Sequence, residues 1–329
     1  MDKEIRIVYM GTPQFAVEPL KAILAQGYDV AAVVTSPDKP AGRGLQLQQS
    51  AVKQFAVANG LPVLQPLSLK DPLFIEQLRS LKANLQVVVA FRMLPEVVWT
   101  MPELGTFNLH ASLLPQYRGA APINHAIING EKETGITTFM LKHEIDTGDI
   151  LMSEKYPIYP DDTAGDLHDR LMVAGAGLVI RTIEGIQNGS LKPLVQSFAE
   201  KPGEILKTAP KILKEHCLID WDKPAEVVRN LIRGLSPVPG AFTLLESPAG
   251  VKMNLKAFKA HTESSPISAH PGTIQTDSVK ELKISCRDAW LMLDELQLQG
   301  KKRMKTDELL RGFRIDNSWK TCDFIEKIG

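Results

Sequence analysis

Cysteine is scarce in this chain of 329 residues, which contains only Cys217, Cys286 and Cys322. Three thiols are an odd number, and they lie far apart, so both a disulfide framework and a zinc cluster are disfavoured. The seven histidines are scattered without the spacing of metal ligands. The sequence therefore predicts reduced thiols and no metal site.

Long apolar runs and an excess of charge are also missing. No stretch approaches the roughly eighteen apolar residues that span a membrane, and the first six residues lack the apolar core of a signal peptide. We therefore expect a cytoplasmic protein without membrane contact. Because 38 Lys+Arg offset 38 Asp+Glu, net charge alone gives no argument for a nucleic-acid partner. Residues 1–205 hold 18 basic and 22 acidic side chains and residues 206–329 hold 20 and 16, an asymmetry compatible with a basic surface on the second part.

Three sequence motifs of common enzyme classes are absent. Gly11-Thr12-Pro13-Gln14-Phe15 has the position of a nucleotide-binding turn but does not match G-x-G-x-x-G, and no Walker sequence occurs. A strand-to-helix bend with proline at the first helical position accounts for Gly11 and Pro13. No serine or cysteine has a G-x-S-x-G setting, which disfavours a covalent acyl-enzyme.

Apolar runs and helical patterns alternate in the first two thirds of the chain. Strands are predicted at Ile5–Met10, Val30–Val34, Leu85–Phe91, Thr106–His110, Gly135–Leu141 and Ile150–Tyr156. Helices are predicted at Phe15–Gln26, Ser50–Asn59, Pro72–Leu81 and Thr163–Ile186. This alternation indicates an α/β fold with a mostly parallel, Rossmann-like sheet and helices on both faces.

The length of the chain suggests two domains. Pro202, Gly203 and Pro210 lie in a stretch without periodicity, so we expect an N-terminal domain at 1–199, a linker at 200–212 and a C-terminal domain at 213–329. After a predicted helix at Pro224–Leu235, short strand-like runs follow at Phe242–Leu245, Val251–Phe258, Gly272–Gln275, Leu282–Cys286 and Trp290–Leu296. These runs favour a small OB-like β-barrel.

Asn108 and His110 stand two positions apart on a predicted strand, so their side chains share a face. Asparagine supplies an amide donor and histidine a titratable nitrogen, the pair that polarises an acyl oxygen and moves a proton. Asp146, in a glycine-containing loop, could orient the histidine. A core histidine, a strand-end asparagine and a turn-capping aspartate are the structural alternatives. We expect Ser112 to bind substrate rather than act as a nucleophile.

Several motifs, in the same order along the chain, resemble one enzyme family. Asn108–Pro122, followed by Asp146-Thr147-Gly148-Asp149, resembles the formyltransferases that use 10-formyltetrahydrofolate. Further segments narrow the resemblance to the methionyl-tRNA formyltransferases, namely Gly11–Ala16, Pro37–Gly44, Ser236–Ala241 and Pro271–Ile274. The resemblance covers nearly the whole chain.

The resemblance implies direct transfer of a formyl group from 10-formyltetrahydrofolate to the α-amino group of methionine on initiator tRNA, for translation initiation. It assigns catalysis to Asn108, His110 and Asp146. Folate would lie against Phe91 and the segment Ser112-Leu113-Leu114-Pro115. The Pro37–Gly44 segment would contact the acceptor arm of the tRNA, mainly through Arg43, and the C-terminal domain would be the OB-like tRNA-binding part. No obligate protein partner is implied.

The chain departs from the family pattern in two places. Relatives are more basic just after Arg43, whereas Leu45–Gln49 follows here, so Lys301, Lys302 and Arg303 could compensate or could form only a solvated turn. Relatives carry an aromatic residue and then glycine where this chain has Phe91 and Arg92, so Phe91 could belong to the core and Arg92 could face solvent. The rival functions are formylation of glycinamide ribonucleotide or of an amino-sugar, and noncatalytic RNA binding.

Overall fold

The computed structural model describes residues 4–41, 46–199, 203, 205–263 and 268–322. By their contacts the residues group into two compact units. The first unit comprises residues 1–122, 133–157 and 168–208. The second comprises residues 123–132, 158–167 and 209–329.

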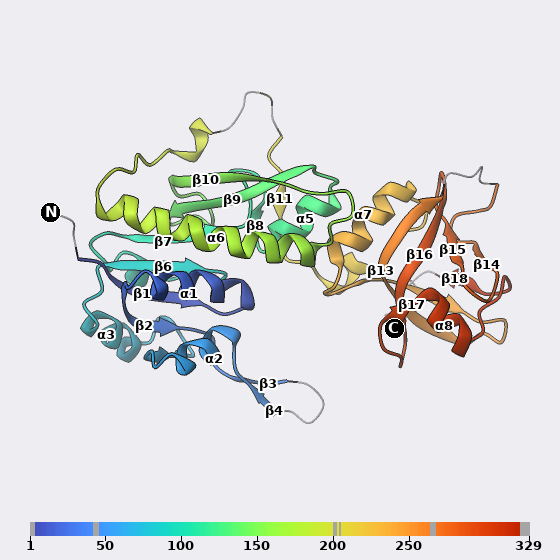
Figure 1. Cartoon of the computed structure of the whole chain (residues 1–329), viewed down its shortest axis with the longest axis horizontal. Helices are drawn as coiled ribbons and strands as arrows, with labels where there is room; N and C mark the ends of the chain where they lie inside the picture. Colours follow the sequence, from blue (N-terminus) through green and yellow to red (C-terminus); the bar gives the residue numbers. More distant parts are fainter. Residues whose placement is uncertain (1–3, 42–45, 200–202, 204, 264–267, 323–329) are drawn as a thin grey trace. The chain divides into compact units, whose positions relative to one another are not determined.

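The first unit is built around a mostly parallel sheet (Figure 1). Its strands are β1 (Arg6–Gly11), β2 (Asp29–Val34), β5 (Val63–Leu64), β6 (Leu85–Val89), β7 (Thr106–His110), β9 (Glu133–Met140) and β10 (Ile150–Pro157). The spatial order is β10-β9-β7-β6-β1-β2-β5. The pairs among β1, β2, β5, β6 and β7 are parallel, whereas β9 is antiparallel to β7 and to β10. The predicted α/β sheet is confirmed.

The order of the strands places a switch point beside β1. The chain runs from β1 to β2 and β5 on one side of β1 and then crosses to β6 on the other side. In open parallel sheets, ligands bind outside the carboxyl ends of the strands near such a reversal. His110 is the last residue of β7, which pairs with β6, so it lies at this carboxyl edge.

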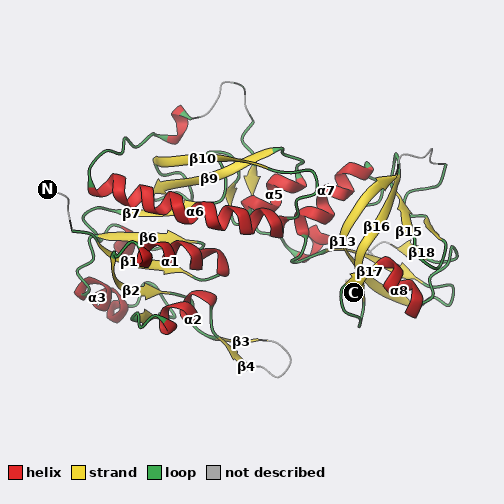
Figure 2. Cartoon of the chain, viewed as in Figure 1, coloured by secondary structure: helices red, strands yellow, loops and turns green. Residues whose placement is uncertain are grey.

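Helices cover both faces of the sheet (Figure 2). They are α1 (Val17–Ala25), α2 (Ala51–Ala58), α3 (Pro72–Ser80), α4 (Glu96–Trp99) and α6 (Ala164–Gln187). Phe74 of α3 and Val98 of α4 share a buried cluster with Val8 of β1 and Val88 of β6. On the opposite face, Thr182 of α6 hydrogen-bonds Thr138 of β9 at 2.8 Å.

The helix starts follow from local side-chain chemistry. The Ser50 hydroxyl accepts from the Lys53 N–H, and an Asp71 oxygen accepts from the Leu73 N–H. Thr163 and Asp166 exchange hydrogen bonds between side chain and backbone, which is the capping box that opens α6. Each cap satisfies a backbone donor that the first turn of a helix leaves without a partner.

The second unit contains a nearly closed antiparallel barrel. Its strands are β12 (Ala241–Glu246), β13 (Lys252–Glu263), β14 (Ile274–Thr276), β15 (Leu282–Ser285), β16 (Trp290–Leu298), β17 (Met304–Lys305) and β18 (Lys320–Cys322). The order is β14-β15-β16-β13-β12-β18, with β17 paired to β16. A bridge between Thr273 and Lys320 joins the two ends of this order. The predicted runs correspond to β12–β16, whereas β17 and β18 were not predicted.

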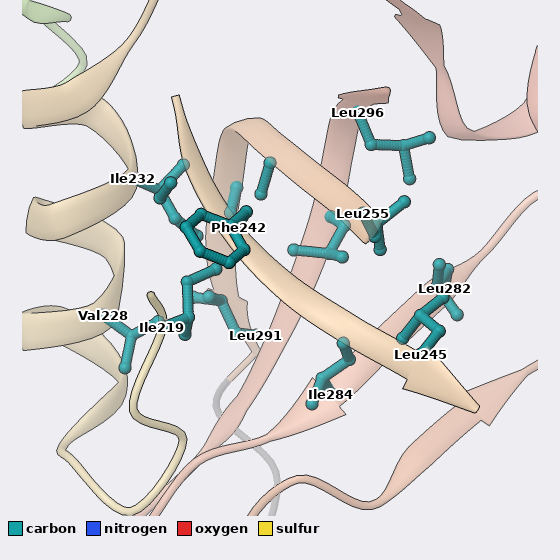
Figure 3. Close-up of a cluster of buried hydrophobic side chains, with 14 of the residues drawn as sticks. Ile219, Val228, Ile232, Phe242, Leu245, Leu255, Leu282, Ile284, Leu291 and Leu296 are labelled. Atoms are coloured by element: carbon teal, nitrogen blue, oxygen red, sulfur yellow. The ribbon is translucent and has the colours of Figure 1, made fainter. Parts of the chain in front are cut away.

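The barrel core is apolar, and a helix contributes side chains to it. Phe242, Leu255 and Leu291 are buried inside the barrel (Figure 3). Helix α7 (Ala225–Leu235) packs Val228 and Ile232 into the same cluster. The helix predicted here is confirmed, and its burial follows from the spacing of four residues that puts both side chains on one face.

Shorter elements complete the described chain. They are η1 (Gln14–Ala16), β3 (Lys39–Ala41), β4 (Gln46–Gln48), β8 (Arg118–Gly119), α5 (Pro122–Ile128), η2 (Gln196–Phe198), β11 (Thr208–Ala209), η3 (Lys214–Cys217) and α8 (Thr306–Gly312). Within the described ranges, no helix is long and apolar enough to cross a membrane. Three or more His, Cys, Asp or Glu side chains suited to a metal do not gather anywhere among the same residues.

The three cysteines carry free thiols, as the sequence predicted. Cys217 and Cys286 are buried. Burial raises the pKa of the Cys286 thiol to about 12. That thiol therefore stays protonated at neutral pH, which makes it unreactive as a nucleophile.

Candidate active site

Strand β7 presents Asn108 and His110 on the face of the sheet away from α6. Leu109, between them, faces α6, because a Cβ added at Gly175 of that helix would come within 2.7 Å of its Cδ2 atom. Side chains alternate along a strand, so the two polar neighbours point the other way. In the pairing with β9, Asn108 stands opposite Phe139 and His110 opposite Thr137.

The imidazole of His110 is held by a backbone carbonyl. Its side chain is almost fully buried, and Nε2 lies 3.0 Å from the carbonyl oxygen of Tyr117. Because a carbonyl oxygen only accepts hydrogen bonds, Nε2 carries the hydrogen and donates it. The ring of Phe139 meets the imidazole edge-on, with 6.4 Å between centroids. Because Nε2 carries the hydrogen, the neutral ring has its free lone pair on Nδ1.

Asp146 faces that free nitrogen. Its Oδ2 atom lies 4.0 Å from His110 Nδ1, beyond a hydrogen bond but close enough for a strong charge interaction once the imidazole is protonated. The same oxygen accepts a hydrogen bond of 3.1 Å from the Gly119 N–H. The carboxylate thus lies beside His110, whereas the sequence left open that it caps its own turn. The Thr147 hydroxyl donates to the Glu144 carbonyl oxygen instead.

Asn108 is only partly exposed, yet its amide oxygen Oδ1 is buried. Among the described residues this oxygen has no hydrogen-bond partner. A buried amide oxygen without a donor costs free energy, on the order of 1–3 kcal/mol. A ligand that brings an N–H group to this position would recover that energy.

The segment from Ser112 to Pro115 is anchored from within the sheet. The Ser112 hydroxyl donates to the Gln116 carbonyl oxygen at 2.6 Å. The Thr137 hydroxyl donates to the Ser112 carbonyl oxygen at 2.7 Å and accepts from the Leu114 N–H at 3.2 Å. The Ser112 hydroxyl is therefore already engaged as a donor, and its expected contact with substrate stays a prediction.

Phe91 and Arg92 follow the carboxyl end of β6. Phe91 is half-buried and packs against the cluster that contains Phe74 and Val98. The Arg92 guanidinium donates to the carbonyl oxygens of Pro66 and Leu67, and its carbon atom Cζ lies 5.6 Å from the Phe91 ring centroid. Two backbone acceptors after β5 therefore hold Arg92 against the protein, and its side chain stays partly exposed. Its partial desolvation lowers the pKa of the guanidinium.

A hollow of about 420 Å³ lies at the loop that carries Asp146. Its lining comes from the loop between β9 and β10 and from α4, namely Trp99, Lys142, His143, Glu144 and Thr147. His143 Nε2 lies 3.1 Å from the Glu96 carboxylate, and its ring meets Trp99 edge-on. None of Asn108, His110 and Asp146 is among the residues that line this hollow.

Two residues that hold the loop of Asp146, namely Gln196 and Arg118, were not assigned a role from the sequence. The buried Gln196 amide donates to the carbonyl oxygens of Asp146 and Gly148, at 2.9 and 2.8 Å. Its Oε1 atom accepts from Arg118 Nε and Nη2, at 3.0 and 2.6 Å. Arg118 belongs to the quoted Asn108–Pro122 motif, but Gln196 stands in a stretch without motif or period, so no sequence signal pointed to it.

The residues expected to contact tRNA belong to the second unit or lie outside the described residues. Arg43 is among residues 42–45, which lie outside the described residues. Lys301 and Lys302 are exposed in the turn between β16 and β17. Arg303 is bound to Glu295 and stacks over Phe258, with its Cζ atom 4.5 Å from the ring centroid.

The base of the expected tRNA-binding loop is held by Asp38. Its carboxylate pairs with Lys53 Nζ at 2.6 Å and accepts from Gln65 Nε2 at 2.8 Å. These hydrogen bonds, that of Lys53 first, lower the pKa of the Asp38 carboxyl below its ordinary value. Beyond Asp38 the chain enters β3, which pairs with β4 as a short antiparallel ribbon.

Known proteins share both the sequence and the fold of this chain. A family model described as formyl transferase matches residues 4–183, more than half of the chain, and one described as formyl transferase, C-terminal domain, matches residues 211–314. An N-formyltransferase of Helicobacter canadensis, solved with folinic acid and dTDP-3-aminofucose, is 22% identical with a TM-score of 0.63. The match covers 88% of this chain and 98% of that one, and at this identity it shows the fold alone.

Closer relatives in sequence carry one name. A methionyl-tRNA formyltransferase of Bacteroides thetaiotaomicron is 54% identical over 318 residues, which cover 97% of this chain and 98% of the relative. Another, of Parabacteroides distasonis, is 52% identical over 313 residues, with 95% and 97% coverage. Identity at this level along nearly the whole length shows that the chain belongs to the methionyl-tRNA formyltransferase family.

Proposed function

We propose that this chain transfers the formyl group of 10-formyltetrahydrofolate to the α-amino group of methionine on initiator methionyl-tRNA, by direct acyl transfer. The observation that carries the proposal is the set of Asn108, His110 and Asp146 at the carboxyl edge of the sheet, in a chain of this family. His110 there offers a free Nδ1 lone pair beside a carboxylate. No covalent enzyme intermediate is needed.

His110 acts as the proton carrier. The attacking amine must be neutral, and a free α-amino group titrates at about 7.7–8.0. Its nitrogen becomes positively charged as the new N–C bond forms, and it then loses a proton. Nδ1 accepts this proton, while Nε2 stays bound to the Tyr117 carbonyl. The Asp146 carboxylate, 4.0 Å away, stabilises the imidazolium. His110 then returns the proton to the folate nitrogen as its bond to the formyl carbon breaks.

Asn108 contacts the reacting atoms through both ends of its amide. Its Nδ2 donates a hydrogen bond to the formyl oxygen as negative charge develops there, and the protonated imidazole adds a positive charge nearby. Its buried Oδ1 accepts from the attacking amine, which gives that oxygen the donor that none of the described residues supplies. An amide is suited to this position because it has a donor and an acceptor and does not titrate.

The folate substrate is proposed to lie along Phe91 and Ser112–Pro115, next to the 420 Å³ hollow. The internal hydrogen bonds of Ser112 and Thr137 give the segment a fixed shape rather than direct polar contacts. The bound substrate supplies the formyl group.

The first test compares site variants in a formylation assay. Asn108→Ala and His110→Ala are each expected to lower turnover by about 10²–10³-fold, the usual loss for an oxyanion donor or a proton carrier. Asn59→Ala and His261→Ala, both at exposed positions, serve as matched controls and are expected to keep normal turnover. Near-normal turnover of a correctly folded His110→Ala protein would sink the assignment.

The same assay identifies the acceptor. Charged initiator tRNA, glycinamide ribonucleotide and an amino-sugar nucleotide are offered in competition. Formylation of the tRNA is expected. If only a small amine were formylated, the tRNA proposal would fail while the formyl-transfer chemistry would stand.

Recognition of tRNA is proposed to use both units. Residues 1–199 would form the catalytic domain, with Arg43 reaching the acceptor arm. Residues 213–329 would bind tRNA through Lys301, Lys302 and Arg303, with 200–212 as the linker. Because Arg303 is already paired with Glu295, charge reversal at Lys301 and Lys302 should have the larger effect. It should raise the KM for tRNA without changing turnover at saturation, and an unchanged KM would exclude this surface.

A further inference from the structure

The side chain of Gln196 makes four hydrogen bonds, all to groups around Asp146. Nε2 donates to the carbonyl oxygens of Asp146 and Gly148, and Oε1 accepts from two guanidinium nitrogens of Arg118. The amide is buried, with 2% of the residue exposed. Its whole hydrogen-bonding capacity is therefore spent on the loop and the turn that flank the catalytic carboxylate.

These contacts hold both the backbone and the carboxylate of Asp146. The backbone of Asp146 has a φ of 56°, a left-handed conformation that a non-glycine residue keeps only when its surroundings enforce it. The Gln196 amide holds that peptide by its carbonyl. The carboxylate is held by the N–H of Gly119, whose neighbour Arg118 is bound by the other end of the same amide.

The turn leaves little freedom for another arrangement. A Cβ added at Gly148 would lie 1.5 Å from the carbonyl oxygen of Met140, so the loop passes directly over the end of β9. The loop backbone therefore has one close packing arrangement there. A small displacement of the loop would move the Asp146 carboxylate from its position 4.0 Å from His110 Nδ1.

The contacts of Gln196 require a side chain that both donates and accepts hydrogen bonds and has the length of glutamine. A carboxylate could accept from Arg118 but could not donate to two carbonyl oxygens, and an ammonium could donate but not accept. A shorter asparagine would lose one methylene of reach. Gln196 also lies outside both family-model matches, which end at residue 183 and resume at 211.

We propose that Gln196 is a positioning residue for catalysis, which sets the Asp146 carboxylate against His110 from a segment between the two matched regions. The inference rests on the proposed formyl transfer. Gln196 touches no reacting atom. It acts through Asp146, by holding the peptides at 146 and 148 and the side chain of Arg118.

Two variants separate the donor from the acceptor function. Gln196→Met keeps the length and removes both functions, whereas Gln196→Glu keeps only the acceptor for Arg118. Because misplacement of a catalytic group by about 1 Å can cost 10²-fold, both variants are expected to lower kcat by about 10²-fold. The KM for each substrate should stay within about threefold, because no substrate contact is removed.

The matched control is Gln86→Met. Gln86 is also a buried glutamine of the first unit, 1% exposed, and its Oε1 accepts from the Thr106 hydroxyl at 3.0 Å. Loss of its hydrogen bond should lower the melting temperature and leave kcat unchanged. The control therefore shows what a purely structural buried amide does.

A spectroscopic readout is independent of substrate. In protein labelled with ¹⁵N-histidine, the His110 Nδ1 signal, assigned with His110→Asn, should shift in Gln196→Met in the same direction as in Asp146→Asn. It should not shift in Gln86→Met. If the wild type failed to formylate methionyl-tRNA, the proposed function would fall, while this signal would still decide the role of Gln196.

Two results would overturn the inference. One is a folded Gln196→Met protein with kcat within about twofold of wild type and an unchanged His110 signal. The other is failure of both Gln196 variants to fold, since that would show that the amide serves the stability of the unit as a whole. A fall in kcat with a displaced His110 signal supports the inference.

Discussion

The two sides of the candidate site are held by different kinds of structure. Asn108 and His110 stand on β7, whose register is set by backbone ladders with β6 and β9. Asp146 stands in a loop, and its position depends on hydrogen bonds from Gln196 and Gly119, residues distant in sequence. A ladder is tolerant of side-chain changes because the backbone makes it. The loop side depends on single side chains, so it should be the fragile half of the site.

The largest expected effect comes from breaking the loop side at its tightest point. In Gly148→Ala the new Cβ would lie 1.5 Å from the Met140 carbonyl oxygen, so the loop must move. Because Asp146 lies two residues away, kcat is expected to fall by about 10²-fold or more. Stopped assays of formylation at saturating substrates measure the loss.

Gly177→Ala is the matched control. At Gly177, in α6, the nearest atom to an added Cβ is Arg181 Nη1 at 3.4 Å. Alanine there should leave kcat unchanged and stabilise the protein by about 0.5–1 kcal/mol, because alanine loses less backbone entropy in a helix. Equal kcat values for the two alanine variants would contradict the claim that the loop side is fragile.

The second expected effect concerns the strand side. Thr137→Val keeps the shape of a fully buried residue but removes the hydroxyl that serves the Ser112 carbonyl and the Leu114 N–H. Each polar group left without a partner costs on the order of 1–3 kcal/mol, so the melting temperature should drop by several degrees. The KM for folate should rise while kcat changes less than in Gly148→Ala, because the β7 ladder remains.

Calorimetry and steady-state kinetics on one preparation distinguish these outcomes. Thr182→Val provides the comparison, since Thr182 is also fully buried; its hydroxyl donates to the Leu178 carbonyl oxygen within α6 and accepts from the Thr138 hydroxyl. It should lower stability without changing the KM for folate. A larger loss of kcat in Thr137→Val than in Gly148→Ala would reverse the proposed ranking of the two sides.

The same contrast explains what the sequence could and could not predict. The strand at Thr106–His110 was predicted with its observed bounds, because alternation and β-branched runs are local signals. The box formed by Thr163 and Asp166 predicted the start of α6 for the same reason. The spacing of two residues was enough to predict that Asn108 and His110 share one face of the strand.

Long-range contacts left no such signal. Nothing near Gln196 in sequence indicates that its amide reaches residues 146 and 148, some fifty positions earlier. The Tyr117 carbonyl, which binds His110 Nε2, is a backbone group and has no sequence signature. Arg92 could have faced solvent by sequence, and only the fold brings Pro66 and Leu67 to it. Side-chain contacts between distant segments become visible only once the chain is folded.

The smallest expected effect lies at the base of the 37–44 loop, where one ion pair holds irregular structure. The pKa of Asp38 is lowered by Lys53 and Gln65, so its contribution to stability is present above the ordinary pKa of 3.8 and is lost as pH falls through the lower folded-state value. Urea denaturation should therefore find Asp38→Asn less stable than wild type at pH 7, with the difference shrinking below about pH 4. In the Gln65→Met background, Asp38→Asn should cause a smaller loss of stability, but not zero, since Lys53 still pairs with Asp38. A gap between wild type and Asp38→Asn that stayed constant from pH 7 to pH 2 would show that the carboxylate charge plays no part, and that this loop is held by its β3–β4 ribbon, as β7 is held by its ladder.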